Sequence, residues 1–264
     1  MTTATSAEAP APAGAQGWRV LGVLSALLGF ASISTDFYLP ALPTMASSLH
    51  SDPGTVAFTI SGYLIGFSLG QLFWGPIGDR YGRRGPIAVG LMLFVIGSAG
   101  CALSGSVPAL IGWRVVQALG ACASVVLARA MVRDLYTGDR AAQVMSTLMT
   151  VMAVAPLLGP VLGGQILAFA GWRAIFWTLV GVGLLTLAAL FTLPETLPPA
   201  RRSTERLGAA FSRYGQLLRQ RRLLGFAGTA GCFFGGTFAY IAGSPFAYIA
   251  YHHLPPQYYG VVFG

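Results

Sequence analysis

The chain has 264 residues, of which 55% are hydrophobic and only 9% are charged. Soluble domains carry about 25% charged residues, so this composition excludes a water-covered globule and predicts an integral membrane protein. The net charge of +8 comes from arginines, because the chain contains no lysine. These arginines lie in short segments between apolar runs, a pattern that favours a role in membrane orientation and argues against nucleic-acid binding.

Taken in chain order, residues 1–16 are rich in Ala, Pro and Thr and are predicted to form a disordered tail. Seven apolar runs follow, each about 20 residues long and therefore able to cross a bilayer as a helix. The predicted fold is all-α, a polytopic membrane helix bundle. The predicted spans cover residues 18–40, 55–74, 86–103, 107–128, 142–169, 174–193 and 223–251, and the last residues begin an eighth span.

The arginines alternate along this chain. Fourteen of the sixteen lie at the start of the first span or after the second, fourth and sixth spans. Cytoplasmic segments collect basic residues, so the N-terminus is predicted to be cytoplasmic. Residues 17–194 then form a first six-helix half, 195–222 a cytoplasmic linker, and 223–264 the start of a second half. The linker fits either an amphipathic surface helix or a solvated connection.

Apart from Arg19 at the start of the first span, two charged residues lie within the predicted spans, and both lie in the outer half of the membrane. Asp36 is near the outer end of the first span. Arg114 is seven residues into the fourth span, or about 10 Å at 1.5 Å per residue. Charged groups in a bilayer are costly and usually face a partner or an aqueous cavity. For Asp36, a cap or an interfacial hydrogen bond is the alternative.

A short basic turn, "GQLFWGPIGDRYGRRGPI" at residues 70–87, joins the second and third spans. Gly75 and Gly78 allow another helix to approach closely. Asp79 can pair with Arg83 four residues later, and Gly82 permits a left-handed backbone.

This turn resembles the signature loop of the major facilitator superfamily, G-x-x-x-D-R-x-G-R-[RK]. The matching residues are Gly75, Asp79, Arg80, Gly82, Arg83 and Arg84. In that superfamily the loop is a conformational latch between two six-span halves. The resemblance therefore implies the N-terminal half of such a fold, followed by span seven and the start of span eight.

Two further motifs extend the resemblance. "LIGWRVVQALGAC" in span four resembles R-x-x-Q-[GA]-x-G through Arg114 and Gln117. "APLLGPVLGGQI" in span five resembles the antiporter pattern G-x-x-x-G-P-x-x-G-G, although Ala155 replaces its first glycine. The residues of this helix motif are Pro156, Gly159, Pro160, Gly163 and Gly164. "STDFYLPALP", "LPETLPP" and "YIAGSPFAYI" resemble the drug:proton antiporters of the bicyclomycin-resistance type.

The resemblance implies a proton-coupled multidrug efflux transporter in the bacterial cell (inner) membrane. Spans one and four line the central cavity in that superfamily, so Asp36, Arg114 and Gln117 are expected to face it and couple proton movement to drug export. A break is expected at Pro245 in span seven. The substrate-cavity candidates are Tyr38, Gln71, Phe234, Tyr240, Ser244 and Tyr248.

The partners expected are small drug-like molecules, protons and the bilayer. No cofactor and no metal site are expected, since the cysteines and histidines lack ligand spacing. No nucleophile–base arrangement indicates an enzyme. An exporter of a sugar or other metabolite, and a non-transporting half-protein that needs a partner, remain as alternatives. Transporters of this superfamily have twelve spans, so we expect the chain to be truncated and not to pump without a second half.

Overall fold

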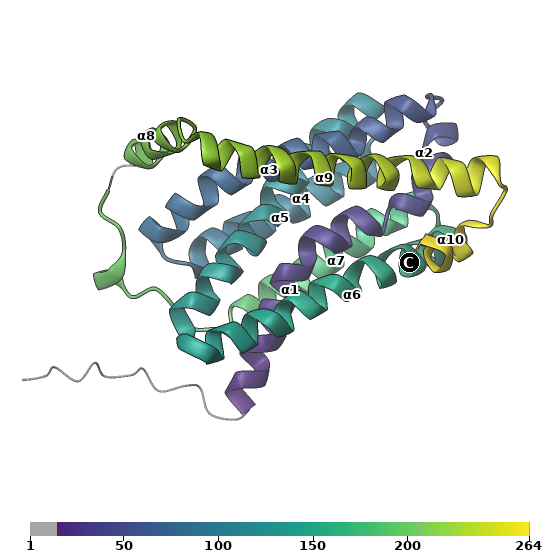
Figure 1. Cartoon of the computed structure of the whole chain (residues 1–264). Coiled ribbons are helices and arrows are strands. Elements are labelled where there is room, and N and C mark those ends of the chain that lie inside the picture. Colours follow the sequence, from purple (N-terminus) through teal and green to yellow (C-terminus); the bar gives the residue numbers. More distant parts are fainter. Residues whose placement is uncertain (1–14, 206, 264) are drawn as a thin grey trace, which may run out of the picture.

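The computed structural model describes residues 15–205 and 207–263, which contain helices and turns but no strand (Figure 1). The helical elements are α1 Ala15–Asp36, the 3-10 turn η1 Leu39–Ala41, α2 Leu42–Ser48, α3 Pro53–Tyr81, α4 Arg84–Leu103, α5 Val107–Leu135, α6 Gly138–Ala170, α7 Trp172–Leu190, the 3-10 turn η2 Pro199–Arg201, α8 Leu207–Leu217, α9 Arg221–Pro245, the π-helical turn η3 Phe246–Tyr251 and α10 Pro256–Phe263. Seven helical segments in the described part of the chain are long and apolar enough to span a membrane, which confirms the predicted all-α membrane bundle.

The helices extend beyond several predicted ends. Residues 15 and 16 belong to α1, so that part of the tail prediction is wrong; residues 1–14 lie outside the described residues. Asp52 caps the start of helix α3, because its side chain accepts a hydrogen bond from the Thr55 N–H at 2.7 Å. The helix continues to Tyr81 and stops at Gly82, which has a φ of +93°. Some charged residues next to the predicted spans therefore lie on helices.

Helix α5 is the most buried of the spans and forms the centre of the bundle. Helices α3 and α4 pack on it, α4 also packs on α7, and α1 packs between α5 and α6. Small residues permit this closeness: a Cβ added at Gly66 would meet the Val115 backbone, and one added at Gly97 would meet the Gln117 backbone. These close contacts fix the register of α5 against α3 and α4.

The segments after α7 are arranged differently from the first six spans. Helix α9 runs across the bundle near α3 and is exposed along most of its length, with Ser244 and Pro245 buried at its end, whereas α10 packs against α6 (Figure 1). The expected break at Pro245 is confirmed, since α9 ends there and continues as the π-helical turn η3. The division into two halves stays a prediction.

Candidate functional site

Arg114 lies at the centre of the bundle and its side chain is completely buried. Two aromatic rings enclose its guanidinium group. The guanidinium carbon lies 4.1 Å from the Tyr38 ring centroid and 4.3 Å from the Tyr63 ring centroid. The negative face of an aromatic ring attracts a cation, and this contact is strongest where water is excluded. Tyr38 comes from the end of the first span and Tyr63 from α3, so three elements build this site.

A chain of hydrogen bonds fixes the orientation of Arg114. Its Nη1 donates to the Ser34 carbonyl at 3.0 Å and to Gln117 Oε1 at 2.6 Å. Gln117 Nε2 donates to Ser98 Oγ at 2.8 Å, and Ser98 Oγ donates to the Phe94 carbonyl at 2.7 Å. Gln117 and Ser98 each accept one hydrogen bond and donate the next, so the chain runs from α5 to α4 in a single direction.

The predicted acid, Asp36, lies close to this cluster without forming an ion pair with it. The Ser34 carbonyl that Arg114 contacts is two residues before Asp36. Asp36 is 6% exposed, and its Oδ1 accepts a hydrogen bond from Thr35 Oγ1 at 3.2 Å. The ion pairs in the described residues both involve Arg83. Nε and Nη2 of Arg114 have no hydrogen-bond partner in the described residues, so they can receive an anionic group.

Asp36 packs on the glycine face of α6. A Cβ added at Gly159 would lie 2.7 Å from the Asp36 Cβ, and one added at Gly163 would overlap the Phe37 carbonyl. A Cβ at Gly164 would meet the start of α10 instead. The predicted close-packing face is therefore confirmed, and it brings α1 and α10 onto one helix.

An apolar cavity of about 380 Å³ opens next to Asp36, between α1 and α6. Phe37 and Gly159, which flank the position of the acid, both belong to its wall. The cavity is lined by Ile33, Phe37, Thr150, Val151, Val154, Ala155, Leu158, Gly159 and Leu162. Sites of this size and character suit small molecules with an apolar body.

The other predicted cavity residues do not line the cavity next to Asp36. Ser244 and Tyr248 gather around Tyr259 of α10: the Ser244 hydroxyl and the Tyr259 hydroxyl are 2.7 Å apart, and the rings of Tyr248 and Tyr259 are 6.4 Å apart. Tyr240 is half-exposed and stacks on Phe263.

Three predicted residues have surroundings that differ from an open cavity wall. Tyr38 is completely buried beneath Arg114, while Gln71 and Phe234 have exposed side chains. Sequence reasoning missed Tyr63, Ser98 and Tyr259. The available signal was weak: each is a hydroxyl-bearing side chain in an apolar run, where such a group needs a partner.

The signature loop lies at the opposite end of the bundle. The predicted pairing of Asp79 with Arg83 is confirmed at 2.7 Å, and Arg83 Nε also donates to Asp134 Oδ2 at 2.8 Å. Close approach at Gly78 is confirmed, because an added Cβ would overlap Leu127. The same prediction is wrong for Gly75, which faces open space.

The linker folds against this loop. Glu195 accepts hydrogen bonds from the backbone N–H groups of Arg83, Arg84 and Leu197. Burial raises the pKa of the Glu195 carboxyl, but these bonds and nearby Arg202 outweigh burial and hold the pKa below its usual range. The Ser203 N–H donates to the Asp79 carbonyl, and Arg80 donates to the Glu205 carbonyl. The first part of the linker is therefore docked on the signature loop.

The sequence profile of the Major Facilitator Superfamily matches residues 24–264 of the chain. The chain is 38% identical over 248 residues to the uncharacterized MFS-type transporter YdgK of Bacillus subtilis, covering 93% of the chain and 61% of the relative. It is 36% identical over 244 residues to a bicyclomycin resistance protein homolog of Haemophilus influenzae, covering 92% and 61%. The chain belongs to the major facilitator superfamily.

Other relatives match over a smaller share of the two sequences. The chloramphenicol resistance protein of Pseudomonas aeruginosa is 38% identical over 160 residues, covering 60% of the chain and 38% of the relative. Among solved structures, a bacterial homolog of the human lysosomal transporter Spinster matches with a TM-score of 0.76, at 16% identity over 95% of the chain and 60% of that structure. The chain thus spans about three fifths of the length of the curated relatives YdgK and the bicyclomycin resistance homolog.

Proposed function

We propose that the whole protein exports drug-like molecules across the cytoplasmic membrane in exchange for protons, with the N-terminus in the cytoplasm. One observation carries this proposal. The buried base Arg114 contacts the Ser34 carbonyl, two residues before the buried acid Asp36; its charge has no carboxylate partner among the described residues, and an apolar cavity opens next to the acid. The names of the bicyclomycin- and chloramphenicol-resistance relatives support the substrate class.

In this proposal the Asp36 carboxyl carries the exchanged proton. When it is protonated it is neutral and occupies the glycine face of α6. When the proton leaves, the carboxylate can turn toward the two unpartnered N–H groups of Arg114, because opposite charges attract strongly where water is excluded. Tyr38 and Tyr63 hold the guanidinium plane in place, so the carboxylate is the moving group. The adjacent cavity wall at Phe37 and Gly159 would change with it.

The experiment is uphill transport of bicyclomycin and chloramphenicol into inverted vesicles that contain the whole protein, driven by an imposed proton gradient. Asp36→Asn keeps the shape of the side chain but cannot release a proton, so it should abolish uphill transport. Asp52→Asn is the matched control, because Asp52 caps α3 outside the membrane and asparagine caps helices equally well. Undiminished uphill transport by Asp36→Asn would refute the proposal.

The same vesicles test the metabolite alternative. Solved structures of a xylose:proton symporter resemble the chain with TM-scores of 0.58 to 0.61 at 18–20% identity, and this likeness shows the fold alone. A proton-driven flux of xylose or another sugar, together with no flux of either drug, would favour a metabolite exporter.

A further inference from the structure

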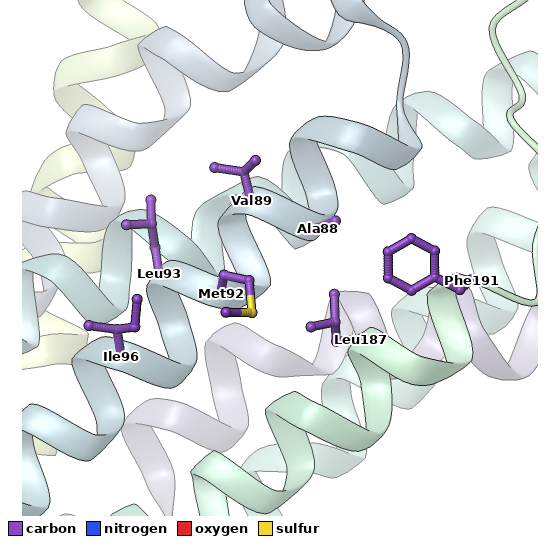
Figure 2. A pocket seen from close by; sticks show the side chains of 7 residues that line it. All are labelled: Ala88, Val89, Met92, Leu93, Ile96, Leu187 and Phe191. Carbon is purple, nitrogen blue, oxygen red and sulfur yellow. The ribbon is translucent and has the colours of Figure 1, made fainter.

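A second apolar hollow lies on the outside of the bundle, on helices other than the two that border the first cavity. It is a groove of about 400 Å³ between α4 and α7 (Figure 2). Every side chain that lines it is apolar. The lining residues are Ala88, Val89, Met92, Leu93, Ile96, Leu187 and Phe191. Val89 is 56% exposed and Phe191 is 54% exposed, so the groove faces the surroundings of the bundle.

The position of the groove defines the kind of molecule it can hold. Both α4 and α7 are membrane-length helices, so hydrocarbon surrounds them. From Ala88 to Ile96 the groove follows α4 for eight residues, or about 12 Å at 1.5 Å per residue. This is close to the depth of one leaflet, because the hydrocarbon core of a bilayer is about 30 Å thick. A lipid acyl chain therefore fits the groove in both length and polarity.

A positive charge marks one end of the groove. The Arg84 guanidinium carbon lies 4.8 Å from the Phe191 ring centroid, and Arg84 Nη2 donates to the Phe191 carbonyl at 3.1 Å. Arg84 Nε is buried without a hydrogen-bond partner in the described residues. The guanidinium is thus attached to the groove wall with donors still available, and guanidinium groups match phosphate oxygens in geometry.

The carboxylates near Arg84 are occupied by other groups. Asp79 and Asp134 pair with Arg83. Glu195 accepts the backbone N–H of Arg84 and not its side chain. Among the described residues, the Arg84 side chain has no ion-pair partner, so its charge is available to an external anion.

We propose that the α4–α7 groove binds one anionic phospholipid, with an acyl chain along Val89 and Met92 and the headgroup phosphate on Arg84. An anionic lipid is favoured over a zwitterionic one because its net charge complements Arg84. Phe191 contributes to both the acyl-chain groove and the phosphate site, since its ring forms the groove wall and also supports the guanidinium group of Arg84. This binding is independent of the transport proposed above.

The test is native mass spectrometry of the purified 264-residue chain in detergent, titrated with phosphatidylglycerol or phosphatidylcholine of identical acyl chains. The wild type should bind phosphatidylglycerol about fivefold more tightly, as expected for one basic residue next to an anionic lipid. Arg84→Gln should lower phosphatidylglycerol binding to the level of phosphatidylcholine. Arg222→Gln is the matched control, because Arg222 also lies over a phenylalanine ring, that of Phe226 on α9.

A second variant tests the groove separately from the charge. Val89→Trp fills the groove and should weaken binding of both lipids, whereas Leu185→Trp, at an exposed α7 position outside the groove lining, should change neither. Circular dichroism and gel filtration verify that each variant is folded. Equal binding of the two lipids by the wild type, wild-type binding by Arg84→Gln, or no effect of Val89→Trp would each overturn the proposal.

Discussion

Arg83 and Arg114 are both buried arginines, yet the two ends of the bundle hold them in opposite ways. Arg83 lies between two carboxylates, those of Asp79 and Asp134. Arg114 has two tyrosine rings, one carbonyl and one amide oxygen around it, and no carboxylate pairs with it in the part of the chain that the structure describes. The same side chain is therefore electrically neutralised at one end and left as a net charge at the other.

The difference separates a structural role from a responsive one. Burying an ion costs several kcal/mol, and a nearby opposite charge offsets much of that cost. Arg83 has such compensation and ties α3 to α5. Arg114 has only dipoles and ring faces around it, so its energy depends strongly on the charge state of any acid that approaches. In the proposed function Asp36, two residues after the Ser34 contact, is that acid.

Of the changes that compare the two ends, replacing the uncompensated arginine by lysine has the largest expected effect. Arg114→Lys keeps the charge but loses the flat group that fills the space between Tyr38 and Tyr63. A desolvated cation–π contact contributes about 2 kcal/mol, which corresponds to about a thirtyfold lower transport rate. Initial rates of drug export by the whole protein provide the measurement. Wild-type rates in the lysine variant would show that the tyrosine enclosure has no functional role.

Replacing Arg83, the compensated arginine, should lower the thermal stability of the protein. Arg83→Met leaves the Asp134 carboxylate partly buried without its partner, and an unsatisfied polar group costs about 1–3 kcal/mol. Thermal unfolding in detergent measures this loss. A double-mutant cycle should give a larger coupling energy for Arg83 with Asp134 than with Asp79, because Asp79 is more exposed. Equal coupling energies would contradict this account of the loop.

A pair of glycine substitutions sharpens the comparison of the two ends. Gly163→Ala places a Cβ against the Phe37 carbonyl next to Asp36, and overpacking of this kind costs about 1–3 kcal/mol. Gly75→Ala faces open space in a helix and should stabilise the protein by about 0.5–1 kcal/mol. Thermal unfolding of the two variants shows directly whether each substitution stabilises or destabilises the protein. A destabilising Gly75→Ala would mean that this helix face is covered.

The smallest expected effect is the pH dependence of the docked linker. The pKa of Glu195 is lowered in the folded protein, so its contribution is complete above the ordinary glutamate pKa of about 4.3 and is lost as the pH falls through the lowered value. The protection factors of the Arg83 and Arg84 amides against hydrogen exchange should therefore fall in acid, because both amides donate to Glu195. Glu195→Gln should remove this step, and an unchanged step in that variant would assign it to another group.

Much of the fold follows from composition and local pattern. Seven long apolar runs can only be helices in a bilayer, and Gly82 marks the end of α3 because it supplies a positive φ. The pair Asp79–Arg83 follows from i,i+4 spacing. Asp134 as a second partner was not predictable, since α5 continues past its apolar run and only the packed structure brings that turn to Arg83.

The site was predictable in its charges but not in its contacts. Asp36 and Arg114 stand out because charges are rare in apolar runs. The enclosure by Tyr63 and the bond from Gln117 to Ser98 depend on the register between α3, α4 and α5, which is set by close contacts at residues such as Gly66 and Gly97. Such contacts are long-range packing, and the sequence pattern of one helix does not contain them.

Proton release on drug binding tests the central contrast most directly. The purified whole protein is mixed with chloramphenicol in weakly buffered solution, and a pH indicator reports released protons. If the Asp36 proton is exchanged beside an uncompensated Arg114, the wild type and Asp52→Asn release protons and Asp36→Asn releases none. Equal proton release by wild type and Asp36→Asn, with drug binding intact in both, would contradict the account.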